Sequence, residues 1–254
     1  MRVTFLGTGT SQGVPIIACD CYVCSSSHSK DKRLRSSVLV VHKETSLVVD
    51  TGPDFRQQML THKVKKMDAV VFTHEHKDHT AGFDDIRGFN WSSGEPMEVF
   101  ADVRVEKALK NDFHYAFAAN TYPGVPKLNL HVIDHRPFTI GDFHIQPIQV
   151  MHHKLPVFGY RMGDFTYITD ANYISPEEIE KVKGSKVVVL NALRKSEHIS
   201  HFTLNEAIAL AKEIGAERTY FTHFSHQMGL HTEVSEELPD GMYLAYDGLE
   251  INIG

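Results

Sequence analysis

The chain has 254 residues, of which 42% are hydrophobic and 23% are charged, a balance that is ordinary for a soluble globular protein. Its net charge of −6 argues against a broadly basic surface, so nucleic acid is not the expected partner. No apolar run approaches the roughly 18 residues that span a bilayer, and no signal-peptide core follows Met1. We therefore expect a cytoplasmic protein without membrane segments. No linker or composition break divides residues 1–254, which predicts a single domain.

Residues 3–6 predict a first strand, and the Gly-Thr-Gly-Thr segment at 7–10 predicts a tight turn after it. The G-x-G-x-x-G spacing of dinucleotide sites is missing, so we interpret this segment as a structural turn. Residues 37–41 and 46–50 predict two strands joined by a short turn. Asp50 ends the second strand and is either a metal ligand or a carboxylate that orients the ligand loop. We favour the second role.

All three cysteines, Cys19, Cys21 and Cys24, fall within six residues. An odd number at such close spacing is a poor disulfide framework, but three thiolates suit a tetrahedral zinc that lacks one ligand. The fourth ligand must then come from elsewhere in the chain. The alternative is three reduced, partly buried cysteines. Asp20 and the serines that follow favour an exposed loop, and therefore zinc.

Three imidazoles and a carboxylate follow directly after an apolar strand predicted over residues 69–72: His74, His76, Asp78 and His79. In an extended segment, residues two positions apart lie on the same face, so His74 and His76 can bind one ion. Asp78 and His79 follow where the chain turns and can face a second ion. Helices are predicted over 54–61, 80–89 and 103–113, and a loop over 120–126.

The second half of the chain predicts strands over 143–150, 167–170, 186–190 and 218–222 that alternate with helices. Ser175 with Glu178, and Thr203 with Glu206, form capping boxes that open two of these helices. Their expected ends are Gly184 and Gly215. Sheets covered by helices are the economical arrangement for this pattern, which places the chain in the α/β class.

Each pair of ligands in the 74–79 cluster is incomplete, because catalytic zinc or manganese sites need three or more protein ligands beside a water position. We predict that His152, Asp170 and His223, which lie at other strand ends, complete them, with Asp170 as a bridge. The first ion would be held by His74, His76, His152 and Asp170. The second would be held by Asp78, His79, Asp170 and His223. Two such ions lie roughly 3.5–4 Å apart and acidify a shared water, the nucleophile of hydrolysis. The alternative, core histidines or adventitious metal binding, does not explain why four strands end in ligand residues.

The pattern His74-x-His76-x-Asp78-His79 resembles the signature of the metallo-β-lactamase superfamily, and further motifs of that family match in order and approximate spacing. The matching residues are Asp50, His152, Asp170 and His223. The resemblance implies an αββα sandwich, two mixed sheets flanked by helices, with a two-metal hydrolytic site at one sheet edge.

A narrower resemblance, to the PhnP-like phosphodiesterases, rests on Cys19-x-Cys21-x-x-Cys24 and on the His223-Phe224-Ser225-His226 segment. It implies that His223 binds the second catalytic ion and that His226 completes a structural Cys3His zinc site.

The segment 198–204 resembles the one that carries the active-site histidine of that family, and His201 aligns best. Its implied role is a general acid for the leaving group or a hydrogen-bond donor to a phosphoryl oxygen. His198 is the alternative to His201 for this role. His153 lies beside His152, and the spacing favours His152 as the metal ligand. We therefore predict Asp78, which is also a ligand, and His201 as the catalytic residues.

The expected function is a phosphodiesterase that cleaves a small or cyclic phosphodiester with two catalytic ions, zinc or manganese, and one structural zinc. Other hydrolases of the superfamily are alternatives: a tRNA 3′-processing nuclease, a lactonase or a thioester hydrolase. The nuclease would need a basic platform for RNA, and no such run of Lys and Arg is present. A non-catalytic metal-binding or sensing protein is the alternative outside enzymes. The resemblance also implies a homodimer, which no residue pattern indicates.

Overall fold

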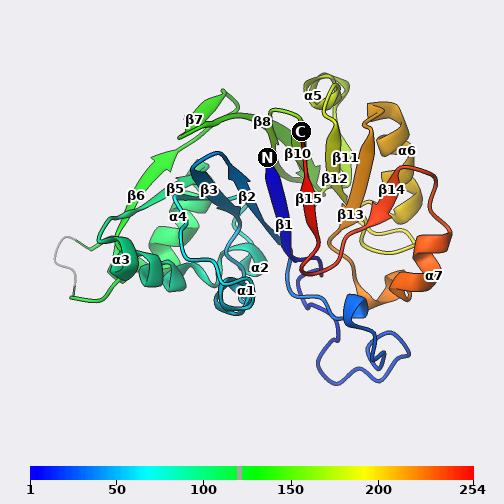
Figure 1. The fold of residues 1–254 in the computed structure, drawn as a ribbon, viewed down its shortest axis with the longest axis horizontal. Helices are drawn as coiled ribbons and strands as arrows, with labels where there is room; N and C mark the ends of the chain where they lie inside the picture. The colour runs from blue at the N-terminus through cyan, green and yellow to red at the C-terminus, as the bar shows by residue number, and fades with distance from the viewer. Residues whose placement is uncertain (119–121) are drawn as a thin grey trace.

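Two β-sheets packed face to face, with helices on both outer surfaces, make up the computed structural model of the chain (Figure 1). The structure describes residues 1–118 and 122–254. The loop predicted over 120–126 therefore lies partly outside the described residues. This four-layer arrangement confirms the αββα fold.

The two sheets repeat one strand pattern. The first sheet has the order β15 (Glu250–Asn252), β1 (Arg2–Gly7), β2 (Ser37–His42), β3 (Thr45–Val49), β4 (Ala69–Val71), β5 (Met97–Ala101), β6 (Leu128–Val132). The second has the order β11 (Tyr173–Ile174), β8 (Phe143–His152), β9 (Leu155–Met162), β10 (Phe165–Tyr167), β12 (Val187–Asn191), β13 (Arg218–Thr222), β14 (Met242–Leu244), with β7 (Phe138–Ile140) paired to β8. Along each of these seven-strand orders, three antiparallel pairings are followed by three parallel pairings. Parallel strands end at a common edge, where side chains from distant segments can meet.

Alternating side chains along the strands build three separate cores. Val38 and Val40 face the opposite sheet, whereas Leu39 between them faces the helices. In the second sheet Val189 faces inward and Val188 faces the helix side. Because successive side chains of a strand point to opposite faces, an uninterrupted apolar run marks a strand that is buried on both sides.

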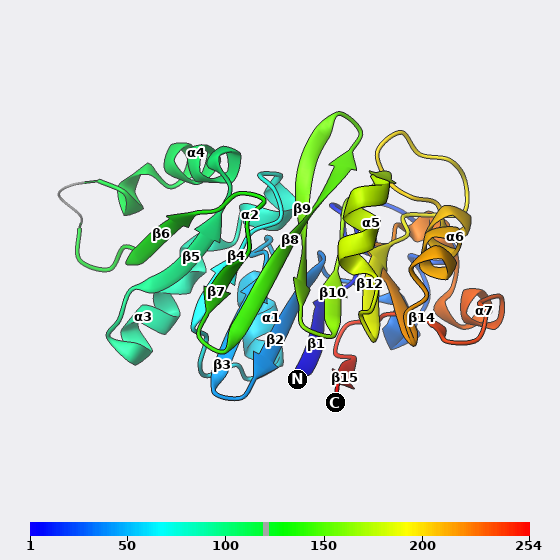
Figure 2. The same cartoon turned by 90° about the horizontal axis from the view of Figure 1, so that it is seen from above.

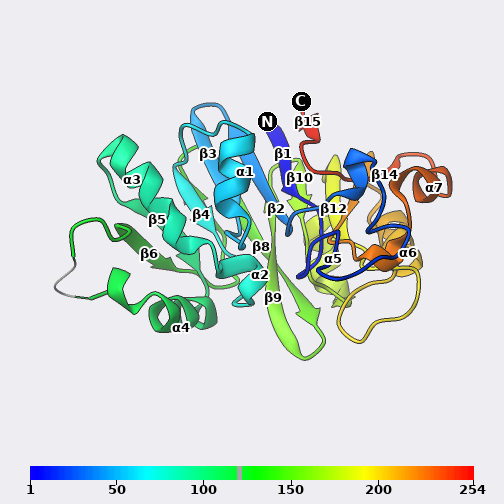
Figure 3. The same ribbon diagram turned by 90° about the horizontal axis from the view of Figure 1, so that it is seen from below.

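Helices cover each outer face. On the first sheet lie α1 (Phe55–Thr61), α2 (Lys77–Thr80), α3 (Arg87–Ser93) and α4 (Val103–Asp112) (Figure 3). On the second lie α5 (Pro176–Val182), α6 (Leu204–Ile214) and α7 (His231–Glu236) (Figure 2). Short 3₁₀ turns are η1 (Ser29–Asp31), η2 (Phe83–Ile86), η3 (His114–Ala116) and η4 (His226–Met228). Among the described residues, no helix combines the length and apolar character needed to cross a membrane.

The single helix predicted over 80–89 is wrong, because this stretch is divided between the end of α2, η2 and the start of α3. Phe83 and Ile86 are buried as their spacing indicates, but a spacing of three fits a 3₁₀ turn as well as an α-helix. The chain turns at Gly82, where an added Cβ would lie 2.1 Å from the carbonyl oxygen of Gly52.

Of the two predicted capping boxes, only the one at α6 is complete. There the Thr203 side chain accepts a hydrogen bond from the Glu206 amide, and the Glu206 carboxylate accepts one from the Thr203 amide. Ser175 caps α5 in the same way, but the Glu178 carboxylate accepts from the Gln149 amide of β8 instead. A tertiary contact has therefore replaced the second half of that box.

The N-terminal loop crosses from the first sheet to the C-terminal half of the molecule, where Figure 1 shows it below α7. Gly9 forms bridges with both Arg35 and Phe224. The amide of Thr10 donates to the carbonyl of Phe224, and the amide of Phe224 donates to the carbonyl of Thr8. Residues 8–36 are thus held beside the loop that follows β13.

Candidate metal centre

The predicted ligands come together where four strands end. The 74–79 cluster follows β4, His152 is the last residue of β8, Asp170 follows β10, and His223 follows β13. Asp50, Asp170 and His223 have φ angles of 65°, 54° and 62°. Left-handed backbone is uncommon outside glycine, with Asp and His enriched among the exceptions, and such strain gathers at functional sites.

Three imidazoles form the first group of possible ligands. The ligand atoms of His74, His76 and His152 all lie within 4.8 Å of one another, and Nε2 of His74 is 3.0 Å from Nδ1 of His76. His74 and His152 are buried, whereas His76 is exposed. The group is therefore open to solvent on the side of His76.

Two carboxylates and two imidazoles form the second group. The ligand atoms of Asp78, Asp170 and His223 meet the same limit of 4.8 Å. Nε2 of His79 lies 3.2 Å from Asp78 Oδ2 and 3.1 Å from Asp170 Oδ2. Asp170 Oδ1 is 3.2 Å from Nε2 of His223. Asp170 lies between the groups, because it also clusters with His74 and His79.

Hydrogen bonds at Nδ1 turn the Nε2 lone pair of His74 and of His152 toward the cluster. Nδ1 of His152 donates to the carbonyl oxygen of Ser200 over 2.9 Å. The Thr73 hydroxyl donates to Asp50, so at 3.0 Å it accepts from Nδ1 of His74. With the proton on Nδ1, each neutral ring presents an unprotonated Nε2, the arrangement that metal-binding histidines adopt.

The second group is oriented in the same way. Nδ1 of His79 donates to Asp50 Oδ2 over 2.7 Å. The Thr169 hydroxyl donates to Asp170 and lies 3.4 Å from Nδ1 of His223, from which it can accept. Asp50 is fully buried and its oxygens are occupied by Thr73 and His79. These contacts fit a carboxylate that orients the ligand loop, and that role stays a prediction.

The charges of this cluster suit bound cations. Burial lowers the pKa of His74, His152 and His223, the last to about 4, so these rings are neutral near pH 7. Burial would raise the pKa of Asp170, but His223 and His79 outweigh it and hold the pKa well below its usual range. Burial would likewise lower the pKa of His79, but nearby carboxylates, Asp78 first, raise it well above the ordinary value.

The fit to a metal pair is clearest at His79. Its buried Nε2 makes no hydrogen bond, although two carboxylates lie within 3.2 Å. A cation at that point satisfies the imidazole nitrogen and both carboxylates at once. Imidazole and carboxylate are the ligands of catalytic zinc and manganese, so the donor set fits two divalent ions, and their binding by these residues stays a prediction.

The structure separates the candidate histidines. His201 is buried, and its Nε2 lies 3.0 Å from Asp170 Oδ1. His198 lies one ring further out, with 3.2 Å between the Nδ1 atoms of the two residues. His153 is exposed at the turn after β8, and it belongs to none of the ligand groups among the described residues.

Thr10 is a cluster residue that the sequence interpretation missed. Its hydroxyl lies 3.1 Å from Nε2 of His223, so the Gly-Thr-Gly-Thr turn does more than reverse the chain. The contact joins residues 213 positions apart, and the only signal in the sequence is a Gly-rich turn after the first strand.

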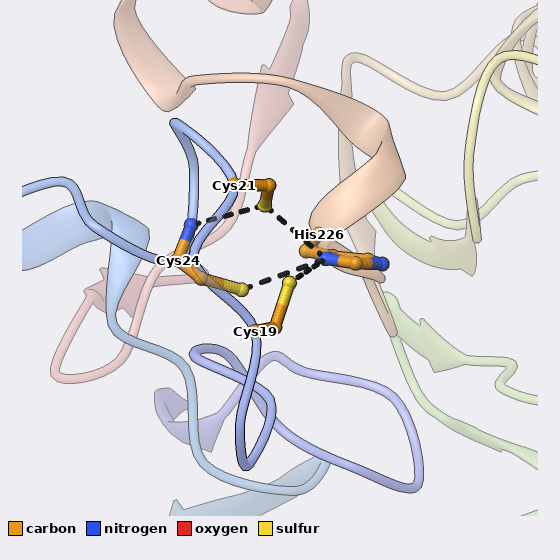
Figure 4. A group of neighbouring side chains, drawn as sticks. All are labelled: Cys19, Cys21, Cys24 and His226. Atoms are coloured by element: carbon orange, nitrogen blue, oxygen red, sulfur yellow. Dashed lines mark hydrogen bonds between the residues drawn. The ribbon is translucent and has the colours of Figure 1, made fainter.

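The cysteines form a second centre with His226 (Figure 4). The Sγ atoms of Cys19, Cys21 and Cys24 lie 3.3, 3.3 and 3.5 Å from Nδ1 of His226. A tetrahedral zinc with bonds of about 2.3 Å to sulfur and 2.0 Å to nitrogen places these atoms about 3.5 Å apart. A hydrogen bond from the Cys24 amide lowers the pKa of Cys21 to about 6, which favours the thiolate that zinc requires. The geometry fits a site that ties the N-terminal loop to η4.

Comparison with known proteins gives a family match. The model of the β-lactamase superfamily domain matches residues 45–224. An octanoyltransferase of Porphyromonas gingivalis is 40% identical over 253 residues, which are 98% of this chain and 51% of that protein. The chain therefore spans about half the length of this curated relative.

Similar solved structures support the same family and fold. The crystal structure of a diphosphatase from the PhnP family is 38% identical, has a TM-score of 0.93 and covers 100% of this chain and 98% of its own. Zn²⁺-bound PqqB from Methylobacterium extorquens is 19% identical, with a TM-score of 0.80 and 100% of both chains covered. At that identity the second likeness shows the fold alone.

Proposed function

The chain belongs to the metallo-β-lactamase superfamily, close to the PhnP family, and we propose that it is a phosphodiesterase that cleaves small or cyclic phosphodiesters. The family match shows that the chain has the fold of the superfamily's hydrolases. Which bond it attacks is our proposal. The observation that carries it is the convergence of imidazole and carboxylate atoms around Asp170 from four strand ends.

Two divalent ions bound there would supply Lewis acidity toward a phosphoryl group and acidify water near neutral pH. The proposed holders of the first are His74, His76, His152 and Asp170. The proposed holders of the second are Asp78, His79, Asp170 and His223. Because Nδ1 of His79 and of His152 is held by an acceptor, these rings keep a fixed orientation, and little reorganisation is needed when a cation arrives.

His201 is the proposed proton donor to the leaving group. Its Nε2 faces Asp170 at 3.0 Å, so an ester oxygen at the cluster would come within hydrogen-bond reach. Its Nδ1 lies 3.0 Å from the Ser200 hydroxyl, which holds the ring in place. This position favours His201 over His198, which lies one ring further from Asp170.

A diphosphate is the second candidate substrate class. The PhnP-family neighbour that is 38% identical is a diphosphatase, and cleavage of a P–O–P bond needs the same ligand set and the same proton donor. The octanoyltransferase match takes up only half of that protein, so its name does not assign acyl transfer to the matched part. The net charge of −6 disfavours the tRNA nuclease alternative.

The test combines metal analysis with a substrate panel. Purified protein is expected to hold about three metal equivalents and to hydrolyse phosphodiesters or diphosphates faster than lactones, thioesters or precursor tRNA. Turnover confined to a carbon ester or thioester would reject the attack on phosphorus. Full metal loading without hydrolysis of any ester would favour a sensing role.

Neighbouring histidines give a matched pair of variants. His152→Asn removes a proposed ligand, whereas His153→Asn changes an exposed residue whose φ of 57° asparagine tolerates. We expect His152→Asn to lose metal and at least about 100-fold in kcat, the range of metal-ligand and Lewis-acid losses, and His153→Asn to retain both. Equal behaviour of the two variants would contradict the proposed ligand set.

A further inference from the structure

A groove between α1 and α3 lies on the outer face of the first sheet (Figure 3), and none of the proposed metal ligands is among the described residues that line it. Its volume of about 520 Å³ falls within the roughly 300–1,000 Å³ that is typical of small-molecule sites. Phe55 and Met59 of α1 are buried in its wall, and the ring centroids of Phe55 and Phe89 lie 6.4 Å apart. Leu60 and Trp91 also line it and are 57% and 72% exposed. This α1–α3 groove is therefore an apolar concave surface that faces solvent.

A glycine widens the groove. Gly88 lies within α3 and lines the groove, at a helix position where alanine would be more favourable. A Cβ added at Gly88 would meet no other part of the described chain within 4 Å, so tight packing does not require glycine here. The missing side chain leaves space in the groove.

The rim of the groove is positively charged. Arg56, Lys63 and Lys65 line it and are exposed, and within residues 1–118 and 122–254 no carboxylate lies within 4.0 Å of their charged groups. Asp85 is the one carboxylate among the described residues of the lining. In a chain whose net charge is −6, this local excess of cations attracts anions.

The lining also limits the chemistry of a ligand. Apart from charged side chains, the polar side-chain groups among its described residues are the Ser92 hydroxyl and the Trp91 indole N–H. A sugar or a nucleobase would leave several polar groups without partners, which costs free energy. An alkyl chain has no such groups and gains from contact with the apolar wall. A flat membrane surface does not reach the wall of a concave site, so a single amphiphilic molecule fits better than a bilayer.

We propose that the α1–α3 groove binds a small anionic amphiphile, an alkyl chain that ends in a carboxylate or a phosphate. The chain packs against Phe55, Met59 and Trp91, and the headgroup pairs with Lys63 and Lys65. Charge complementarity at the rim selects the headgroup, and burial of apolar area supplies most of the affinity. The site goes beyond the proposed function and does not depend on which bond the metal centre attacks.

Trp91 is the only tryptophan of the chain, so its fluorescence reports whether the groove is occupied. Metal-loaded protein is titrated with hexanoate, octanoate and decanoate, and with octyl phosphate. We expect a saturable shift of the emission to shorter wavelength, because an alkyl chain over the exposed indole removes it from water. Decanoate should bind with a Kd below about 1 mM, and each added methylene should tighten binding by about 4-fold.

Two comparisons test the headgroup. Wild-type protein should bind octanoate about 5-fold more tightly than 1-octanol or octylammonium at low salt, and this preference should shrink as salt rises. The double variant Lys63→Gln, Lys65→Gln should lose the preference and still bind 1-octanol. The control variant, Lys107→Gln with Lys212→Gln, removes two exposed lysines of α4 and α6 that do not line the groove and should keep the preference.

Gly88→Leu tests the apolar wall. The new side chain takes up space in the groove, so binding of every amphiphile should weaken by at least about 10-fold. Gly88→Ala adds one methyl group and should bind within about 3-fold of wild type. Both residues favour a helix over glycine, so both variants should melt at or above the wild-type temperature.

Four results would overturn the site. The first is the absence of a saturable Trp91 response to octanoate and decanoate, and the second is equal affinity for octanoate, 1-octanol and octylammonium. A shift seen only with phosphatidylglycerol vesicles would assign the groove to a membrane surface. A shift that grows with protein concentration and needs no ligand would assign it to a second copy of the chain. Wild-type affinity in folded Gly88→Leu would likewise place the ligand elsewhere.

Discussion

Asp50→Asn removes one oxygen from the hydrogen-bond network behind the cluster while keeping the size of the side chain. The Asp50 carboxylate accepts from the Thr73 amide at 2.8 Å, the Thr73 hydroxyl at 2.8 Å and Nδ1 of His79 at 2.7 Å. An asparagine has one acceptor oxygen, so its NH2 group must face at least one of these donors. If it faces His79, the imidazole proton moves to Nε2 and blocks the ligand atom.

The expected loss of metal affinity follows from two independent considerations. A buried donor without an acceptor costs about 1–3 kcal/mol, and loss of a residue that orients a metal ligand typically costs about 10–100-fold in metal affinity. We therefore expect metal binding to the second ligand group to weaken by about 10–100-fold in Asp50→Asn, with loss of activity at limiting metal.

Competition with a chromophoric chelator measures this affinity. Asp54→Asn is the control, because it removes the same charge from the same loop, at a carboxylate 3.1 Å from the Arg35 guanidinium and outside the cluster. Wild-type affinity at both ions in Asp50→Asn would refute the bracing role. An equal loss in Asp54→Asn would show that the charge alone is responsible.

Three further changes test other parts of the molecule. Cys21→Ala should remove about one zinc equivalent and lower the melting temperature while the other metals stay bound; unchanged zinc content would rule out the structural site. His201→Ala should reduce kcat by about 10²–10⁴-fold, most for poor leaving groups, and equal losses for good and poor leaving groups would exclude the acid role. Burial raises the pKa of Asp247 from 3.8 to about 6. The contribution of its protonation to folding stability is therefore complete below about pH 4 and is lost as pH rises through 6. Urea unfolding should therefore show Asp247→Asn gaining up to about 3 kcal/mol on wild type between pH 4 and 7, and a constant difference would contradict this.

Local patterns predicted the strands and helices whose signals lie within a few residues. The apolar run before the 74–79 cluster is β4, and Thr203 with Glu206 opens α6 as expected. β9 was missed, because Pro156 and Gly159 in its sequence are typical of chain breaks. Gly159 lies there because an added Cβ would be 2.7 Å from the side chain of Ile168, a close approach between neighbouring strands. That requirement is tertiary and leaves no periodic signal.

The sequence by itself determined which ligand types the protein carries and that they stand at strand ends, because the spacing of two residues and the order of apolar runs are local properties. Only the tertiary structure decided which of them meet. It brought Thr10 to His223 and set His201 rather than His198 against Asp170. These contacts depend on how two sheets and a long N-terminal loop pack, and packing is set by the whole chain rather than by any segment of it.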